Sequence, residues 1–113
     1  MQVINKVAIA AGAAVANLLA GSAFEFVASD ALVEIAILGS VTGLLASVSS
    51  GNDILLENDS YVGVVTAAGR LPVYPDDYAI VDEALAGDRL RLAVRNPSAG
   101  AIDCVYAVRI TPA

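Results

Sequence analysis

The most constraining feature of this sequence is a pair of alternating runs in residues 88–110. Residues 89–95 alternate arginines with the apolar side chains of Leu90, Leu92 and Val94. Residues 102–110 place on one face Ile102, Cys104, Tyr106, Val108 and Ile110. A period of two is typical of a β-strand with one buried face. Because the intervening NPSAG favours a chain reversal, the sequence predicts a hairpin whose apolar face other strands must cover.

Weaker alternation and turn residues predict further short strands along the chain. They are expected at residues 2–9, 24–27, 32–38, 44–49, 54–57, 61–66 and 78–81. The runs at 32–38 and 44–49, joined by GSVTG, predict a second hairpin. In residues 24–27, Phe24 and Phe26 are expected to point into the core and Glu25 into solvent.

Short strands at intervals of roughly 8–12 residues are typical of an antiparallel sandwich or barrel. We predict an all-β fold, an antiparallel two-sheet β-sandwich that forms a single domain over residues 1–113. A jelly roll is preferred over an immunoglobulin-like arrangement, because the chain has no tryptophan and one cysteine in place of the Cys…Trp…Cys pattern. Cys104 is expected in the core as a small hydrophobic residue.

Residues 1–20 fit either an N-terminal arm or an edge strand. The alanine-rich residues 10–20 suit a helix, or an extended segment with a tight turn, almost equally. The uncharged residues 7–24 are similar to a signal peptide or a short membrane span, but alanine and glycine insert weakly and Asn17 lies among them. We therefore expect a packed segment of the domain and no transmembrane segment.

The absence of histidine excludes a Ser-His-Asp triad, a Cys-His pair and the commonest zinc ligand. Carboxylates gather in predicted turns, at Asp53, Glu57 and Asp59, at Asp76 and Asp77, and at Asp82 and Glu83. Hydrolysis or calcium binding would require several of them to converge, whereas solvated turn positions explain them without a site. No glycine-rich phosphate loop occurs. We predict no enzyme, no catalytic residue, no cofactor and no metal ligand, and calcium binding by the acidic loops stays open.

The charge of the chain bears on its partners. A net charge of −6 disfavours nonspecific nucleic-acid binding. A composition of 58% hydrophobic and 16% charged residues leaves few charges for the surface, so apolar exterior is expected to contact a partner. The arginines of the terminal hairpin are expected to form one stripe, without the interleaved aromatics of a nucleic-acid platform. We predict that this stripe pairs with carboxylates at an interface, and we assign to that interface Arg89, Arg91, Arg95, Arg109, Tyr74 and Tyr78.

A family resemblance rests on four stretches, residues 17–26 (NLLAGSAFEF), 50–53 (SGND), 72–77 (PVYPDD) and 86–96 (AGDRL…RN). Together they resemble small bacteriophage virion proteins of the single-jelly-roll type. The resemblance implies a capsid, cement or minor coat subunit, located in the virion, whose partners are copies of itself and other virion proteins. It carries no catalytic residue across. Coat proteins that package a genome often have a basic N-terminal arm. In residues 1–20 of this chain Lys6 is the only charged side chain, so no direct nucleic-acid contact is expected.

The alternative hypothesis is a carbohydrate-binding or adhesive β-sandwich module. Tyr61, Tyr74 and Tyr78 would then offer rings for stacking on a sugar, although tyrosines near an irregular loop more often anchor the loop.

Overall fold

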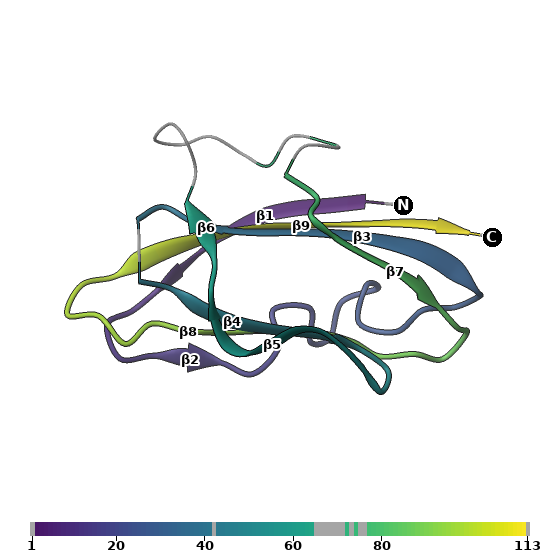
Figure 1. The fold of residues 1–113 in the computed structure, drawn as a ribbon, viewed down its shortest axis with the longest axis horizontal. Helices are drawn as coiled ribbons and strands as arrows, with labels where there is room; N and C mark the ends of the chain where they lie inside the picture. The colour runs from purple at the N-terminus through teal and green to yellow at the C-terminus, as the bar shows by residue number, and fades with distance from the viewer. Residues whose placement is uncertain (1, 42, 65–71, 73, 75–76, 113) are drawn as a thin grey trace.

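The computed structural model describes residues 2–41, 43–64, 72, 74 and 77–112, and at 57–61 and 63–64 it describes the backbone. These residues form two β-sheets that lie one above the other (Figure 1). The first sheet has the order β1-β9-β3, with β7 and β6 both paired to β3, and the second has the order β2-β8-β4-β5. The strands are β1 (Gln2–Ile9), β2 (Ala14–Val15), β3 (Ala31–Gly39), β4 (Leu45–Ser50), β5 (Asp53–Tyr61), β6 (Gly63–Val64), β7 (Ile80–Ala84), β8 (Leu90–Arg95) and β9 (Ile102–Pro112).

The predicted all-β, antiparallel two-sheet sandwich is confirmed. Among the described residues the strand pairings are antiparallel, apart from the short parallel pairing of β6 with β3. Most of the expected strands are present, with boundaries that differ by a few residues. Of the strand expected at 61–66, the described part belongs to β5 and β6, and residues 65–66 lie outside the described residues.

Both predicted hairpins are wrong, because the chain crosses between the sheets at each of these connections. β8 pairs with β2 and β4 in the second sheet, while β9 pairs with β1 and β3 in the first. β3 and β4 likewise belong to different sheets. Alternation identifies the buried face of a strand but not its neighbour, so two strands that face each other across a core have the same pattern as a hairpin. The hairpin that does form joins β4 to β5 through Gly51 and Asn52.

The core lies between the sheets and is built from the alternating positions that the sequence singles out. The inward side chains of β3, β8 and β9 are almost fully buried, among them Val33, Ile35, Leu90, Leu92, Cys104 and Val108. Cys104 occupies the expected core position, and burial raises the pKa of its thiol to about 12. Removing such side chains from water is the main favourable term for folding.

The segment of residues 20–27 differs from the predicted strand. It is a series of turns with one isolated bridge, between Phe26 and Arg89. Phe24 packs partly buried against the core, whereas Phe26 is 55% exposed, so the prediction that both rings enter the core is wrong. Glu25 was expected in solvent, but its side chain is only 13% exposed. A turn at Gly21, with φ of 75°, breaks the alternation on which the prediction depended.

Residues 2–27 line one edge of each sheet in turn. β1 is an edge strand of the first sheet and pairs along its length with β9. The chain then turns at Gly12 and, through β2 and a series of turns, follows β8, with backbone hydrogen bonds from the N–H of Leu18 to the carbonyl of Leu92 and from the N–H of Val27 to the carbonyl of Asp88. None of the described residues belongs to a helix long and apolar enough to cross a membrane.

Candidate functional site

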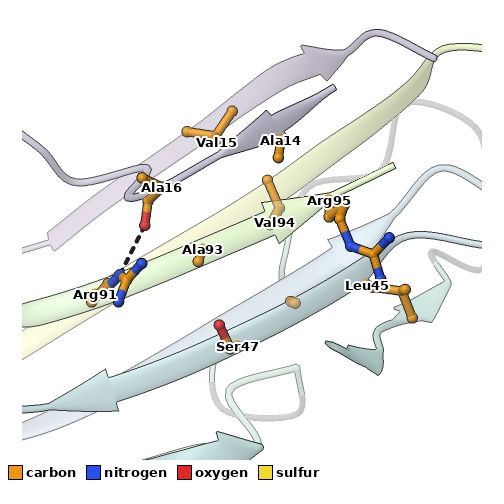
Figure 2. A pocket seen from close by; sticks show the side chains of 10 residues that line it. Ala14, Val15, Ala16, Leu45, Ser47, Arg91, Ala93, Val94 and Arg95 are labelled. Carbon is orange, nitrogen blue, oxygen red and sulfur yellow. Dashed lines mark hydrogen bonds between the residues drawn. The ribbon is translucent and has the colours of Figure 1, made fainter. Parts of the chain in front are cut away.

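A shallow groove crosses the outer face of the second sheet (Figure 2). Alternation along β8 points Arg91, Ala93 and Arg95 outward. On the neighbouring strand β4, the small side chain of Ser47 lies beside Ala93. The groove has a volume of about 290 Å³, with an arginine toward each end and small side chains between. The Nε–H of Arg91 donates to the carbonyl of Ala16 at 3.0 Å, which fixes this arginine against the neighbouring segment.

Arg89 continues this face beyond Arg91 and forms an ion pair with Glu25. Its Nε lies 2.9 Å from Glu25 Oε2, and the backbone N–H of Gly21 donates to Oε1, also at 2.9 Å. These contacts, first the Gly21 hydrogen bond and then Arg89, lower the pKa of Glu25 below its ordinary value of 4.5. Arg89 therefore stabilises the turn at residues 21–25, while its side chain remains 52% exposed.

The predicted stripe of four arginines is wrong, since Arg109 lies on the other side of the molecule. It is on β9, and it projects from the outer face of the first sheet. There its guanidinium carbon lies 4.1 Å from the centroid of the Tyr74 ring, a cation–π contact. The Tyr74 hydroxyl donates to Glu34 Oε1 at 3.3 Å. The arginines assigned to one interface thus belong to two opposite surfaces.

Tyr78 packs beneath Tyr74 and is buried over Ala36 and Ala107 of the first sheet. The two rings meet edge to face, with centroids 5.2 Å apart. Burial raises the pKa of Tyr78, and Arg109 opposes that shift. The burial of the Tyr78 ring and the contact between Tyr74 and Arg109 hold these two tyrosines against the first sheet. The side chain of Tyr61 lies outside the described residues.

The acidic residues do not form a shared site in the part of the chain that is described. Asp82 and Glu83 are successive residues of β7, opposite Val33 and Leu32, so their side chains point to opposite sides of the sheet. Among described residues, no three His, Cys, Asp or Glu side chains gather in a way that could hold a metal ion. Asp76 and the side chains of Glu57 and Asp59 lie outside the described residues.

Apolar side chains are exposed at the end of the sandwich where β3 begins and β7 and β9 end. Leu85 is 64% exposed, and it lines a groove of about 530 Å³ together with Leu32 and Pro112. A smaller hollow of about 100 Å³ between Phe26 and Pro112 adjoins it. Sequence reasoning missed this surface, because Phe26 and Leu85 lie in turns and come together only through the fold.

These surfaces offer contacts of two different kinds. The groove of the second sheet combines two guanidinium groups with a floor of small side chains, which suits carboxylates or an extended backbone. The end of the sandwich presents leucine and phenylalanine, which suit another apolar surface. Comparison with models of known protein families, with curated protein sequences and with solved structures found no match.

Proposed function

We propose that the sandwich is a jelly roll and that the protein is a structural subunit of a bacteriophage particle. Its role would be that of a capsid, cement or minor coat protein located in the virion, which packs against copies of itself and other virion proteins. The observation that carries the proposal is the order of the strands in the two sheets.

With the two-residue β6 set aside, the sheets read β1-β9-β3-β7 and β2-β8-β4-β5. Among these strands, successive ones lie in different sheets at every step except β4 to β5. In an immunoglobulin-like sandwich three pairs of successive strands stay in the same sheet: A and B, D and E, and F and G. The present order has one such pair, so it favours the jelly roll. Jelly rolls recur in viral capsid proteins and in lectins, so this fold supports a role as a shell subunit.

The surface supports an assembly role as well. Phe26, Ile54 and Leu85 are each more than half exposed, and charged residues make up only 16% of the chain. Exposed apolar side chains of this size mark contact surfaces in soluble proteins when they cluster, as at the β3/β7/β9 end. Neighbouring subunits in a repeated shell would cover them.

Electron microscopy tests this proposal. An antibody raised against the purified protein and coupled to gold is applied to particles purified from the source of the chain, with pre-immune antibody as the control. We expect regular gold labelling of the particles and a band for the chain among the particle proteins. Unlabelled particles that lack the chain in mass spectrometry would reject the virion assignment.

A glycan array addresses the carbohydrate-binding alternative, since lectins share the jelly roll. Of the two tyrosines whose side chains are described in this region, Tyr78 is buried and Tyr74 is 42% exposed with Arg109 over its ring. We therefore expect no binding. A reproducible hit that Tyr74→Ala abolishes would favour the lectin hypothesis instead.

A further inference from the structure

β1 is a regular edge strand that pairs on one side only among the described residues. Its register with β9 runs without interruption from Gln2 opposite Arg109 to Ile9 opposite Ile102. The strand is the end member of the first sheet, so no strand of the described residues pairs with its outer side. Such an edge is a ready template for another strand.

The edges of the second sheet are less suited to the addition of a strand. The edge of β8 is lined by residues 10–27 through backbone bonds and the short β2. The pairing of β5 with β4 contains two register shifts, and irregularities of this kind discourage strand addition. β1 has neither a bulge nor a proline, and Lys6 is its one charged residue.

The direction of the free backbone groups follows from one hydrogen bond. The backbone N–H of Lys6 donates to Asn5 Oδ1 at 2.8 Å, and so it does not point to β9. In an antiparallel pair the N–H groups of alternate residues point to opposite sides of the strand. The N–H groups of Ile4 and Ala8 therefore also point outward and are available to a new strand.

We propose that β1 pairs antiparallel with β1 of a second copy of this chain, about a two-fold axis at Asn5, so that the two first sheets become one continuous sheet. This deepens the proposed function, because it names the surface through which two copies meet. A two-fold contact requires an edge that is complementary to itself. The sequence of β1 meets this requirement with the axis at Asn5.

With the axis at Asn5, Val3 of one copy lies opposite Val7 of the other, and Ile4 lies opposite Lys6. Val3 and Val7 pack partly buried against the core in the single chain, so pairing extends the apolar layer across the junction. Ile4, which is 39% exposed, receives the aliphatic part of the lysine. An axis at Lys6 would place two lysines opposite each other, which is unfavourable.

The proposed register can be tested by placing a charged side chain at position 4. Sedimentation equilibrium over a wide range of concentrations measures the dimer dissociation constant of the full chain and of two variants. Ile4→Lys places a lysine opposite Lys6 at two symmetric positions, so we expect dissociation to be favoured about tenfold or more. Ile4→Glu places a carboxylate there instead, and we expect a dimer at least as tight as that of the original chain.

Val81→Lys is the matched control, since Val81 is an exposed valine on β7, across the first sheet from β1. We expect it to leave the dissociation constant unchanged. Hydrogen exchange of the unsubstituted chain gives a second measurement that depends on no variant. Protection of the Ile4 and Ala8 amides should rise with protein concentration as the dimer forms.

A chain that stays monomeric, with β1 amides equally exposed at all concentrations, overturns the proposal. A dimer that Val81→Lys weakens and Ile4→Lys does not also overturns it, while a role in a shell through another surface would survive. Conversely, a dimer sensitive to charge at Ile4 in a protein that is absent from virus particles would support this pairing and reject the proposed function.

Discussion

Two buried asparagines hold the irregular segments of this protein to its strands. Asn96 is fully buried, and its side-chain amide donates to the carbonyls of Ile9 and Gly100, each at 2.8 Å. Its Oδ1 accepts from both the N–H and the hydroxyl of Ser98. Asn17 supplies Oδ1 to the N–H of Leu92, as a paired strand would supply a carbonyl. The two side-chain amides thus supply hydrogen bonds to backbone groups at places where strand pairing ends.

Asn96→Ala should therefore lower the free energy of unfolding by about 2–4 kcal/mol, because the side-chain amide would no longer donate to the buried carbonyl of Ile9 or accept from the N–H and hydroxyl of Ser98. Urea unfolding followed by circular dichroism measures this change. Asn5→Ala is the control, since Asn5 is exposed and donates to the Tyr106 hydroxyl at 3.3 Å, and it should cost less than about 1 kcal/mol. Equal costs for the two variants would contradict the role assigned to Asn96.

Glu25 gives the stability a predictable dependence on pH. Its lowered pKa means that the folded state favours the carboxylate, so this contribution is present above the ordinary value of 4.5 and is lost as pH falls through the lower pKa of the folded state. Glu25→Gln should reduce the urea midpoint at pH 7, and the difference from the unsubstituted chain should shrink by pH 3. A difference that is the same at both pH values would show that the Glu25 charge is irrelevant.

At the residue scale the sequence predicted the core well and the surface sites less well. Every second residue of the terminal runs is buried, as alternation requires. The outward direction of Arg91 and Arg95 follows from the same pattern. The position of Arg109, the burial of Tyr78 and the bonds of Asn96 depend on which strands become neighbours, and a period of two carries no information on that.

Among the elements, the hairpin of β4 and β5 fits tightly against the connection from β7 to β8. Gly51 has φ of 57°, and a Cβ added there would lie 2.7 Å from Asp88 Oδ1. Asp88 is held in place because its Oδ2 accepts from the N–H of Leu85 at 3.0 Å. The two connections therefore meet only because residue 51 has no side chain.

Gly51→Ala and Gly12→Ala separate backbone strain from this close contact. Gly12 has a similar φ of 71°, but an added Cβ meets nothing within 4 Å, so its substitution should cost about 1 kcal/mol of stability. Gly51→Ala should cost about 2–3 kcal/mol, since Asp88 must also move and give up its bond to Leu85. Thermal or urea unfolding of both variants measures the difference, and equal losses would mean that Asp88 moves aside freely.

The elements were predictable in position but not in pairing. The strands at 2–9, 32–38 and 44–49 were found from alternation and turn residues alone. The connections GSVTG and NPSAG were interpreted as hairpin turns, yet each crosses from one sheet to the other. Five residues are enough either for a hairpin turn or for a crossing between the sheets. Which of the two forms depends on contacts between strands that are distant in the sequence.

On the scale of the whole molecule, the N-terminal quarter of the chain completes both sheets. β1 pairs with β9, residues 10–27 line β8, and Ile9, Leu19 and Val27 belong to the core. A chain that lacks residues 1–27 would expose two long strand edges and lose three buried apolar side chains. It should fail to fold, as judged by a missing unfolding transition in circular dichroism and by aggregation in gel filtration. A soluble fragment with a sharp transition would contradict this.

Successive strands mostly lie in different sheets, and this topology also determines how the protein unfolds. Neither sheet is built from one continuous stretch of sequence, since the first takes strands from the beginning, the middle and the end of the chain. Melting of either sheet would therefore uncover the core face of the other. Heating should therefore give a single calorimetric peak whose van't Hoff enthalpy equals the calorimetric one, with no partially molten species on the way.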